Sequence, residues 1–423
     1  MPRTEKKNLI PREIFPQLIS HLNEPEMSLL VGARQTGKTV LLGMVKEYLL
    51  EKEKTPLQNV LYFNLDIIKD WEFFQDQTKL IKFLKERTER GKIYLLVDEA
   101  QKVPECARFF KGVYDSDLNI KMILSGSASL ELKTRIRESM AGRKQIFHLF
   151  PFSFSEFLMV KDKNLYEILD RKKISELSRK ELISLFKEYA VWGGYPRVVF
   201  SKTEEKKEKI LSEIYTSYIE KDIVGFLEIK NRFGFSKLVK LLAGQIGQLV
   251  NISELAGSLN LDRGTVERYL KALEETFIIT PLYPYFKNPR QEIIKQNKIY
   301  FNDVGIRNYA LSNFSLFEER ADAGFLLENA VFKEITLSLK SSEKNRFWRT
   351  KQGNEIDFLL IKGEDIVPIE VKLGLKDPKI PSGLKIFSEK YLVRKTLVVN
   401  MNIYEKSIGK VYFIHPYEIK KYL

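Results

Sequence analysis

Short apolar runs alternate with amphipathic stretches over the first 150 residues of the chain. The apolar runs have the length and composition of buried strands, and they are Met27–Val31, Val60–Leu65, Ile93–Val97 and Met122–Ser125. Between them, apolar residues recur at helical spacing around Val40–Leu50 and Leu80–Lys85. Strands that alternate with helices are typical of a parallel sheet with crossover helices. We therefore expect an α/β domain over residues 1–155.

The pattern changes twice in the rest of the chain. Residues 156–234 keep a helical period without a clear strand, which predicts a helical lid or connector. Residues 235–310 begin with two short helices and end in the β-rich runs Phe277–Tyr285 and Lys298–Phe301. Residues 311–423 contain a helical stretch and, after it, four or five strand-like runs. This order predicts a second α/β domain.

Composition and charge narrow the class of protein. The chain has 423 residues, of which 44% are hydrophobic and 30% charged, and this excludes a mostly disordered chain. The net charge of +14 favours polyanionic partners such as nucleic acid or nucleotide phosphates. One cysteine and three histidines exclude an intrachain disulfide and a zinc cluster. With no apolar leader and no run of 18 apolar residues, we expect a cytoplasmic protein without a membrane segment.

Residues 32–39 match the pattern G-x-x-x-x-G-K-[ST] directly after an apolar run and before an amphipathic helix. Glycines allow backbone N–H groups to approach phosphates, and the helix N-terminus favours anions. Lys38 is expected at the β- and γ-phosphates and the Thr39 hydroxyl at Mg²⁺. The sequence thus predicts a site for ATP and Mg²⁺, formed by Gly32, Ala33, Arg34, Gln35, Thr36, Gly37, Lys38 and Thr39.

An apolar strand over residues 93–97 ends in the carboxylates Asp98 and Glu99. Asp98 is expected to organise the metal ion, and Glu99 to orient and deprotonate a water molecule for attack on the γ-phosphate. Such a pair alone is often a solvated turn. Together with the phosphate loop it predicts ATP hydrolysis.

Two further residues are candidates for the same reaction. Ser127 follows the run Met122–Ser125, where a hydroxyl could sense the γ-phosphate, although a simple Ser/Gly turn is the alternative. Arg143 is preferred over Arg135 and Arg137 as a transition-state arginine, supplied in cis or by a neighbouring copy in a homo-oligomer. The alternative for Arg143 is a solvated surface charge.

Residues 250–273 have the pattern of two helices joined by a turn at Asn260 and Leu261. In the second helix one face is apolar at Val266, Tyr269, Leu270 and Leu273, while the outward residues are Arg263, Thr265, Arg268 and Lys271. This predicts a winged helix that contacts DNA. Its wing would lie near the phosphate backbone of the DNA and would carry Lys287, Arg290, Lys295 and Lys298. A spacer that contacts protein is the alternative.

Near the end of the chain two predicted strands carry Asp357 and, two residues apart, Glu370 and Lys372. Residues two apart on a strand share a face, and an antiparallel neighbour can bring Asp357 beside them. This pattern resembles the PD-(D/E)XK nuclease superfamily, in which the two carboxylates would hold Mg²⁺ and Lys372 would activate water. Glu328, on the preceding helix, is a candidate further metal ligand or a solvated residue. A hairpin with ordinary surface charges is the alternative for the whole set.

Several segments together resemble a large group of archaeal and bacterial AAA-type ATPases with a C-terminal nuclease-like domain. They are GARQTGKT, IYLLVDEAQKVP, ILSGSASL, AGRKQIFHLFPFSFSEFL and WGGYPR. The resemblance implies an α/β, ASCE-type P-loop NTPase core, a winged helix and a restriction-endonuclease-like domain. The expected function is ATP hydrolysis with DNA binding and DNA cleavage under nucleotide control. The alternative is a nucleotide-gated switch that binds nucleic acid or a partner through an inactive nuclease-like domain.

Overall fold

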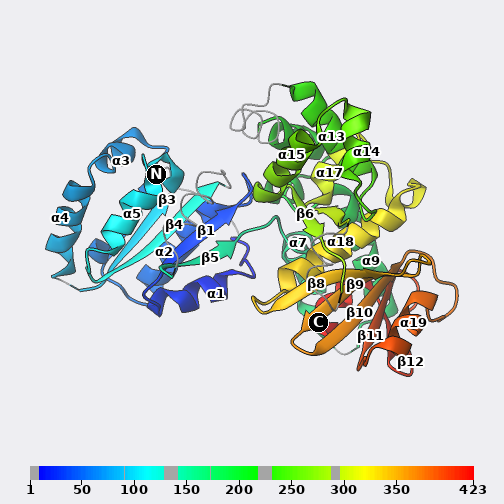
Figure 1. The fold of residues 1–423 in the computed structure, drawn as a ribbon. Helices are drawn as coiled ribbons and strands as arrows, with labels where there is room; N and C mark the ends of the chain where they lie inside the picture. The colour runs from blue at the N-terminus through cyan, green and yellow to red at the C-terminus, as the bar shows by residue number, and fades with distance from the viewer. Residues whose placement is uncertain (1–8, 90, 128–141, 172, 218–230, 287–295) are drawn as a thin grey trace. The chain divides into compact units, whose positions relative to one another are not determined.

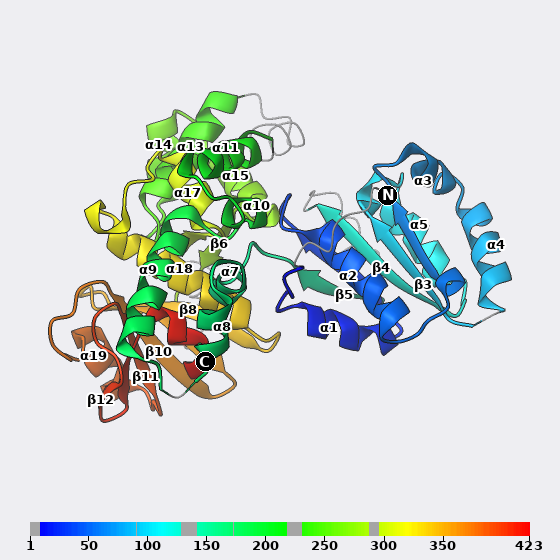
Figure 2. The same cartoon turned by 180° about the vertical axis from the view of Figure 1, so that it is seen from behind.

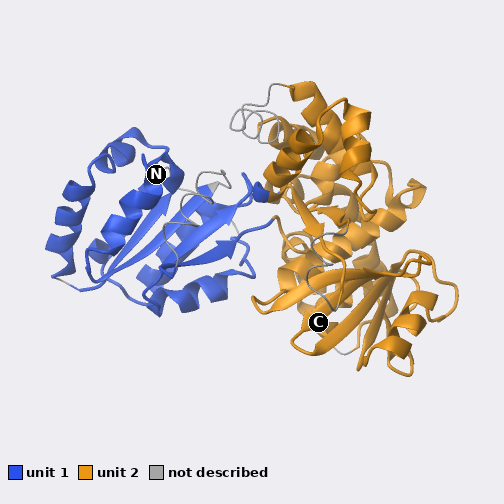
Figure 3. Cartoon of the chain, in the orientation of Figure 1, with its two compact units in different colours: residues 1–150, 275–277 blue, residues 151–274, 278–423 orange. Residues whose placement is uncertain are grey.

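The computed structural model describes residues 9–89, 91–127, 142–171, 173–217, 231–286 and 296–423. The chain divides into two compact units, shown in Figure 3. The first unit contains residues 1–150 and 275–277, and the second contains residues 151–274 and 278–423. A further division of the second unit at residues 234 and 310 stays a prediction. In the described ranges, every helix is too short or too polar to cross a membrane.

The first unit is a five-stranded parallel sheet with helices on both faces (Figures 1 and 2), which confirms the predicted α/β fold. The strand order is β2-β3-β4-β1-β5, and the strands are β1 (Met27–Gly32), β2 (Val60–Asn64), β3 (Ile93–Asp98), β4 (Ile120–Ser127) and β5 (Lys144–His148). Thus β4 lies between β1 and β3. The polar strand β5 was not predicted as a strand.

Side chains of the central strands alternate between two cores, because successive residues of a strand point to opposite faces. Leu30, Leu96 and Ile123 pack with α1 and α2, whereas Leu29 and Leu95 pack with α4 and α5. Burial on both faces explains why these strands are continuous apolar runs in the sequence. The helices of this unit are α1 (Phe15–Ser20), η1 (His21–Asn23), α2 (Lys38–Glu51), η2 (Leu57–Asn59), α3 (Ile68–Phe73), α4 (Gln77–Thr88), η3 (Ala100–Lys102) and α5 (Cys106–Tyr114).

The second unit begins with helices, as the sequence predicts. They are α7 (Phe154–Lys161), α8 (Lys163–Ile168), α9 (Glu176–Trp192), α10 (Pro196–Val199), α11 (Glu204–Ile214), α13 (Arg232–Gly244), α14 (Ile252–Leu259) and α15 (Arg263–Glu275). An antiparallel pair follows, β6 (Ile279–Leu282) and β7 (Lys298–Phe301), and then α17 (Val304–Ala310) and η5 (Phe317–Glu319). Whether α13 to β7 act as a winged helix stays a prediction.

A buried carboxylate fixes α17 against its neighbours. Asp303 accepts a hydrogen bond from Gly194 N at 2.8 Å and lies 3.5 Å from the Lys333 ammonium. A Cβ atom on Gly194 would lie 2.2 Å from the carbonyl oxygen of Phe152, so only glycine fits there. The segment after α9 is therefore packed tightly against α17 and α18.

The last part of the chain is a six-stranded mixed sheet of order β12-β13-β11-β10-β9-β8. It follows α18 (Ala323–Ser338), and its strands are β8 (Glu343–Arg349), β9 (Glu355–Lys362), β10 (Asp365–Lys372), β11 (Thr396–Asn400), β12 (Lys406–Ile408) and β13 (Val411–Ile414). The remaining helices are α19 (Ser382–Lys390), η6 (Pro416–Glu418) and α20 (Ile419–Tyr422). Ile356, Phe387 and Val398 belong to the core of this sheet.

Candidate nucleotide site and carboxylate cluster

The phosphate loop connects β1, which ends at Gly32, to α2, which begins at Lys38. This confirms the predicted order of strand, loop and helix. A Cβ atom on Gly32 would lie 2.2 Å from the carbonyl oxygen of Leu149, and Gly37 has φ +99°. Gly32 is therefore required by the close approach of a distant backbone segment, and Gly37 by its own backbone conformation.

Lys38 is buried at the start of α2. Its ammonium donates to the carbonyl oxygens of Gly32 at 3.1 Å and Ala33 at 2.9 Å. Burial lowers the pKa of Lys38 to about 8, although the nearby carboxylates of Glu99 and Asp98 oppose this shift. The predicted phosphate-binding cation and the predicted acid pair thus belong to one electrostatic environment.

The acid pair stands at the carboxyl end of β3. Asp98 is buried and accepts a hydrogen bond from the Ser125 hydroxyl. Glu99 is half-buried, has the left-handed backbone angle φ +58°, and donates its N–H to Ser125 Oγ at 3.3 Å. The Gln101 amide donates to the Glu99 carboxylate. One serine hydroxyl thereby holds both acids of the pair.

The sequence favours Ser127 over Ser125 only on the premise that Ser127 lies beyond the end of the strand. β4 extends to Ser127, whose Cα pairs with that of Gly32, so this premise is wrong. The Ser127 side chain lies outside the described residues. Val97 pairs with Leu124, and the next pair along these parallel strands brings Asp98 beside Ser125. Ser125 is therefore a site residue that sequence reasoning missed, and the strand register was the missing information.

Arg143 lies at the opposite end of the sheet from the phosphate loop. Its carbonyl oxygen accepts from Met27 N, at the start of β1, and its guanidinium pairs with Asp115 at 2.9 Å. From Met27 to Gly32 a strand rises about 16 Å. The predicted role of Arg143 in cis is therefore wrong, while a role toward a neighbouring copy stays a prediction. Arg135 and Arg137 lie outside the described residues.

Arg12 is a second residue that the sequence analysis missed. Its guanidinium is buried and donates to the carbonyl oxygens of Thr36 at 2.8 Å and Phe150 at 2.6 Å. It thereby fixes the phosphate loop to the segment that follows β5. Because Phe150 is 138 residues away in the sequence, no local pattern could indicate this contact.

The residues around the phosphate loop suit a magnesium ion bound together with a nucleotide. In the described ranges, no group of three or more His, Cys, Asp or Glu residues could hold a metal ion by itself. Mg²⁺ commonly takes one or two protein ligands and completes its shell with phosphate oxygens and water. The buried carboxylate Asp98 and the exposed Thr39 meet that requirement.

Helix α15 has the predicted two faces. Val266, Tyr269 and Leu273 are buried, and Leu270 is half-buried. On the outer face Arg263, Arg268 and Lys271 are exposed and Thr265 is half-buried. Arg263 pairs with Glu267 at 2.9 Å and Lys271 with Glu274 at 3.3 Å, so acids accompany the basic residues. Of the predicted wing residues, Lys287, Arg290 and Lys295 lie outside the described residues.

Lys298 contradicts the predicted wing. It is 2% exposed, and its ammonium lies 3.6 Å from Glu328 Oε1 and 2.5 Å from Glu355 Oε1. A buried ammonium paired with carboxylates is not available to a DNA backbone. Its assignment to a solvent-facing wing is therefore wrong.

Four acidic residues gather where β7, α18, β9 and β10 meet, and we call them the carboxylate cluster: Glu328, Glu355, Asp357 and Glu370. As predicted, Asp357 lies beside Glu370, with Asp357 N 3.4 Å from Glu370 Oε2. The Lys372 ammonium lies 2.6 Å from Glu370 Oε1, which confirms that these two side chains share a face.

Burial dominates the electrostatics of the carboxylate cluster. It raises the pKa of Glu328 to about 8 and that of Glu370 to about 7, and in both cases the nearby Asp357 adds to the effect. Burial also raises the pKa of Asp357. For Lys298 burial favours the neutral amine, but the surrounding carboxylates outweigh it and raise its pKa.

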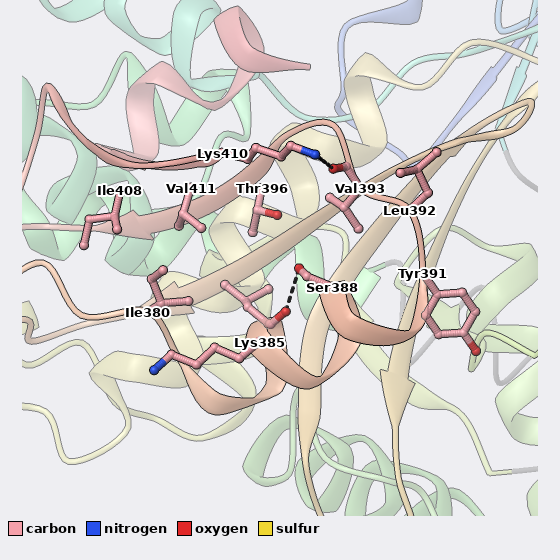
Figure 4. Close-up of a pocket in the computed structure, with 11 residues that line it drawn as sticks. Ile380, Lys385, Ser388, Tyr391, Leu392, Val393, Thr396, Ile408, Lys410 and Val411 are labelled. Carbon is pink, nitrogen blue, oxygen red and sulfur yellow. Dashed lines mark hydrogen bonds between the residues drawn. The ribbon is translucent and has the colours of Figure 1, made fainter.

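A separate cavity of about 320 Å³ lies on the C-terminal sheet (Figure 4). Its lining is mostly apolar, with Leu384, Val393 and Val411 among the residues, and the exposed Leu392 stands beside them. Lys410 also lines it and donates to the carbonyl oxygen of Val393 at 3.0 Å. No sequence motif indicated this cavity.

Three family models match successive parts of the chain. Residues 24–158 match an AAA domain, residues 183–316 match a domain of unknown function (DUF8612), and residues 323–419 match another (DUF4143). An uncharacterised protein of Haemophilus influenzae is 27% identical over 380 residues, which cover 88% of each chain. One from Methanocaldococcus jannaschii is 29% identical over 385 residues, which cover 84% of this chain and 77% of the relative.

Solved structures show more distant likeness. The Walker-type ATPase PABY2304 of Pyrococcus abyssi has a TM-score of 0.48 at 14% identity, over 74% of this chain and 98% of its own. Cdc6p from Pyrobaculum aerophilum has a TM-score of 0.30 at 14% identity, over 78% and 96% respectively. At these scores neither structure informs on function. Residues 24–158, which contain the phosphate loop and the acid pair, thus match an AAA domain, and residues 323–419, which contain the carboxylate cluster, match a DUF4143 domain.

Proposed function

We propose that the first unit binds ATP together with Mg²⁺ and hydrolyses it at the phosphate loop. The observation that carries this proposal is the placement of the buried Lys38 ammonium in the loop, close to the carboxylates of Asp98 and Glu99. Loop N–H groups and the start of α2 receive the phosphates. Thr39 and Asp98 would hold Mg²⁺, and the ion would neutralise charge on the phosphates.

Glu99 is the proposed general base. Its left-handed backbone is unfavourable for a residue with a side chain, and such strain concentrates at functional sites. Its N–H donates to Ser125, and its carboxylate accepts from Gln101, so both its backbone and its side chain are held in place. A carboxylate held in this way can orient a water molecule and accept its proton.

The test compares two variants that separate binding from turnover. Lys38→Ala removes the phosphate contact and should abolish or greatly weaken ATP binding in calorimetry. Glu99→Gln keeps size and should bind ATP normally, yet release phosphate at least about 100-fold more slowly. Glu105→Gln, an exposed isosteric change beyond η3, is the matched control. Wild-type turnover in Glu99→Gln would exclude this residue as the base.

We further propose that α15 contacts DNA phosphates and that nucleotide turnover controls this contact. The support is the exposed set Arg263, Arg268 and Lys271 together with the net charge of +14. Because Glu267 and Glu274 pair with two of these cations, a protein contact is the competing result of the test.

Between cleavage and binding as the output of the second unit, we propose binding. Cleavage of the predicted kind requires a metal ion at Asp357 and Glu370. The Glu370 carboxylate is instead paired with Lys372, and Glu328 and Glu355 are paired with Lys298. These internal ion pairs favour a nuclease-like domain that holds a ligand without cutting it.

A further inference from the structure

We propose that Lys298 is the resident cation of the carboxylate cluster and excludes divalent metal ions from it. The resemblance to PD-(D/E)XK nucleases implies a metal ion at Asp357 and Glu370, with Glu328 as a further ligand. The residues present do not fit that expectation. This inference concerns the second unit alone and does not depend on ATP binding.

The backbone of Lys298 is held from two sides, which fixes where its ammonium lies. Lys298 pairs with Leu282 across the β6–β7 ladder and forms a bridge with Leu249. Its side chain is buried and reaches both Glu328 on α18 and Glu355 on β9. An ammonium buried between two carboxylates is costly to displace, because each partner left behind would be an unpaired buried charge.

Several oxygens of the carboxylate cluster already accept hydrogen bonds from the protein. The Tyr300 hydroxyl donates to Glu328 at 2.5 Å, and Val371 N donates to Asp357 Oδ2 at 2.8 Å. Arg349 donates to Glu355 at 3.1 Å. A metal ion would have to bind beside these donors or displace them.

The charge balance leads to the same conclusion. Three basic side chains, those of Lys298, Lys372 and Arg349, are paired with acids of the cluster, which leaves little negative charge for an ion. The affinity of a site for a divalent ion depends on the number of charged oxygen ligands that it offers. Consistent with this, no metal-capable group of three or more such side chains is found in the part of the chain that the structure describes, which includes all four acids.

Lys298 comes from β7, outside the helix and strands that carry the acids. Its ion pairs therefore join the segment before residue 311 to the C-terminal sheet. In a metal-dependent nuclease the ion would instead be free to enter from solvent. Here the cation is part of the chain and can leave only if β7 moves.

The decisive experiment counts bound Mn²⁺ by electron paramagnetic resonance in the nucleotide-free full chain. Wild type and Asp357→Asn should bind the same number of Mn²⁺ ions per chain, because the carboxylate cluster binds no ion in either protein. Lys298→Met should gain about one Mn²⁺ per chain, and Lys298→Met with Asp357→Asn should lose that gain. Lys362→Met removes a lysine of β9 paired with Glu343 and is the matched control, with no gain expected.

Two results would overturn the proposal. One is a Mn²⁺ site in the wild type that is lost in Asp357→Asn, a comparison that needs no variant of Lys298. The other is a folded Lys298→Met, verified by circular dichroism, that gains no Mn²⁺. If Lys298→Met does not fold, the comparison of wild type with Asp357→Asn still decides whether the cluster is closed to metal.

Discussion

Among single residues, Lys38 gives the nucleotide site a definite pH dependence. Burial lowers its pKa to about 8, and phosphate charge raises it again when ATP binds. Below that pKa the free protein already carries the proton, so binding takes up none. Above it, ATP binding must restore the proton, and affinity should fall by about tenfold per pH unit.

Calorimetry at alkaline pH tests this prediction by measuring the affinity for ATP. Repeating the titration in two buffers of different ionisation enthalpy gives the number of protons taken up on binding. Lys38→Arg is the control, because a guanidinium keeps its proton at these pH values. If that variant binds ATP, its affinity should not change with pH. A wild-type affinity that stays constant up to about pH 9.5 would contradict the lowered pKa.

Ser125 supplies a second residue-scale prediction. Ser125→Ala removes a donor to the buried Asp98 and an acceptor for Glu99 N–H, and should cost about 1–3 kcal/mol of stability. It should also slow phosphate release by about tenfold, because both acids lose a positioning contact. Ser127→Ala is the direct comparison. If phosphate release slows more in Ser127→Ala than in Ser125→Ala, the role predicted for Ser127 from the sequence is favoured instead.

The site residues to which the sequence pointed most directly share one property. Lys38, Asp98 and Glu99 lie in contiguous motifs whose chemistry is local. The environments of Ser125, Arg12 and Lys298 depend on strand register or on contacts between distant segments. Lys298 shows the limit most clearly, because a basic residue in a polar hairpin gives no sign that strand pairing buries it beside Glu328 and Glu355.

Among the elements, α15 carries the prediction on DNA. Charge reversal of Arg263 and Arg268 to Glu should weaken DNA binding for all sequences and reduce the slope of log affinity against log salt by about 2. The matched control reverses Lys163 and Lys180, which are exposed and also paired with acids four residues away. Fluorescence anisotropy over a salt series measures both. Unchanged binding in the α15 variant would assign this helix to protein contact.

Element types were predictable wherever burial imposed a period. The i, i+3 and i+7 spacing of Val266, Tyr269 and Leu273 identified the buried face of α15. Strand direction was not predictable for β5, whose sequence Lys-Gln-Ile-Phe-His is largely polar. Without that strand, nothing in the sequence indicates that Arg143 lies at the end of the sheet away from the phosphate loop.

For the whole molecule, the division into two units leaves one short segment, residues 275–277, apart from its neighbours in the sequence: it belongs to the first unit, whereas the residues on both sides belong to the second. Phe277 belongs to the first unit, where its ring lies 5.2 Å from the ring of His148 and 5.9 Å from that of Phe150. Phe277→Ala should destabilise the first unit by about 1–3 kcal/mol, since these ring contacts and part of a buried surface are lost.

A thermal melt identifies the first unit's transition, because saturating ATP should raise it. Phe277→Ala should lower that same transition, although the residue lies far along the chain from the sheet. Phe233→Ala, at a phenylalanine of the second unit that is 79% exposed, should leave the ATP-sensitive transition unchanged. An unaltered first transition in Phe277→Ala would show that residues 275–277 contribute nothing to this unit.

Because residues 275–277 belong to the first unit, the two units are joined by more than one connection of the backbone. The backbone passes between the units three times, after residues 150, 274 and 277. Residues 151–274 therefore form a loop whose two ends both continue into segments of the first unit. A single protease cut inside this loop produces two fragments, each of which contributes to the first unit. The fragments are thus expected to remain together as a complementing pair, so that a nicked chain keeps its nucleotide site.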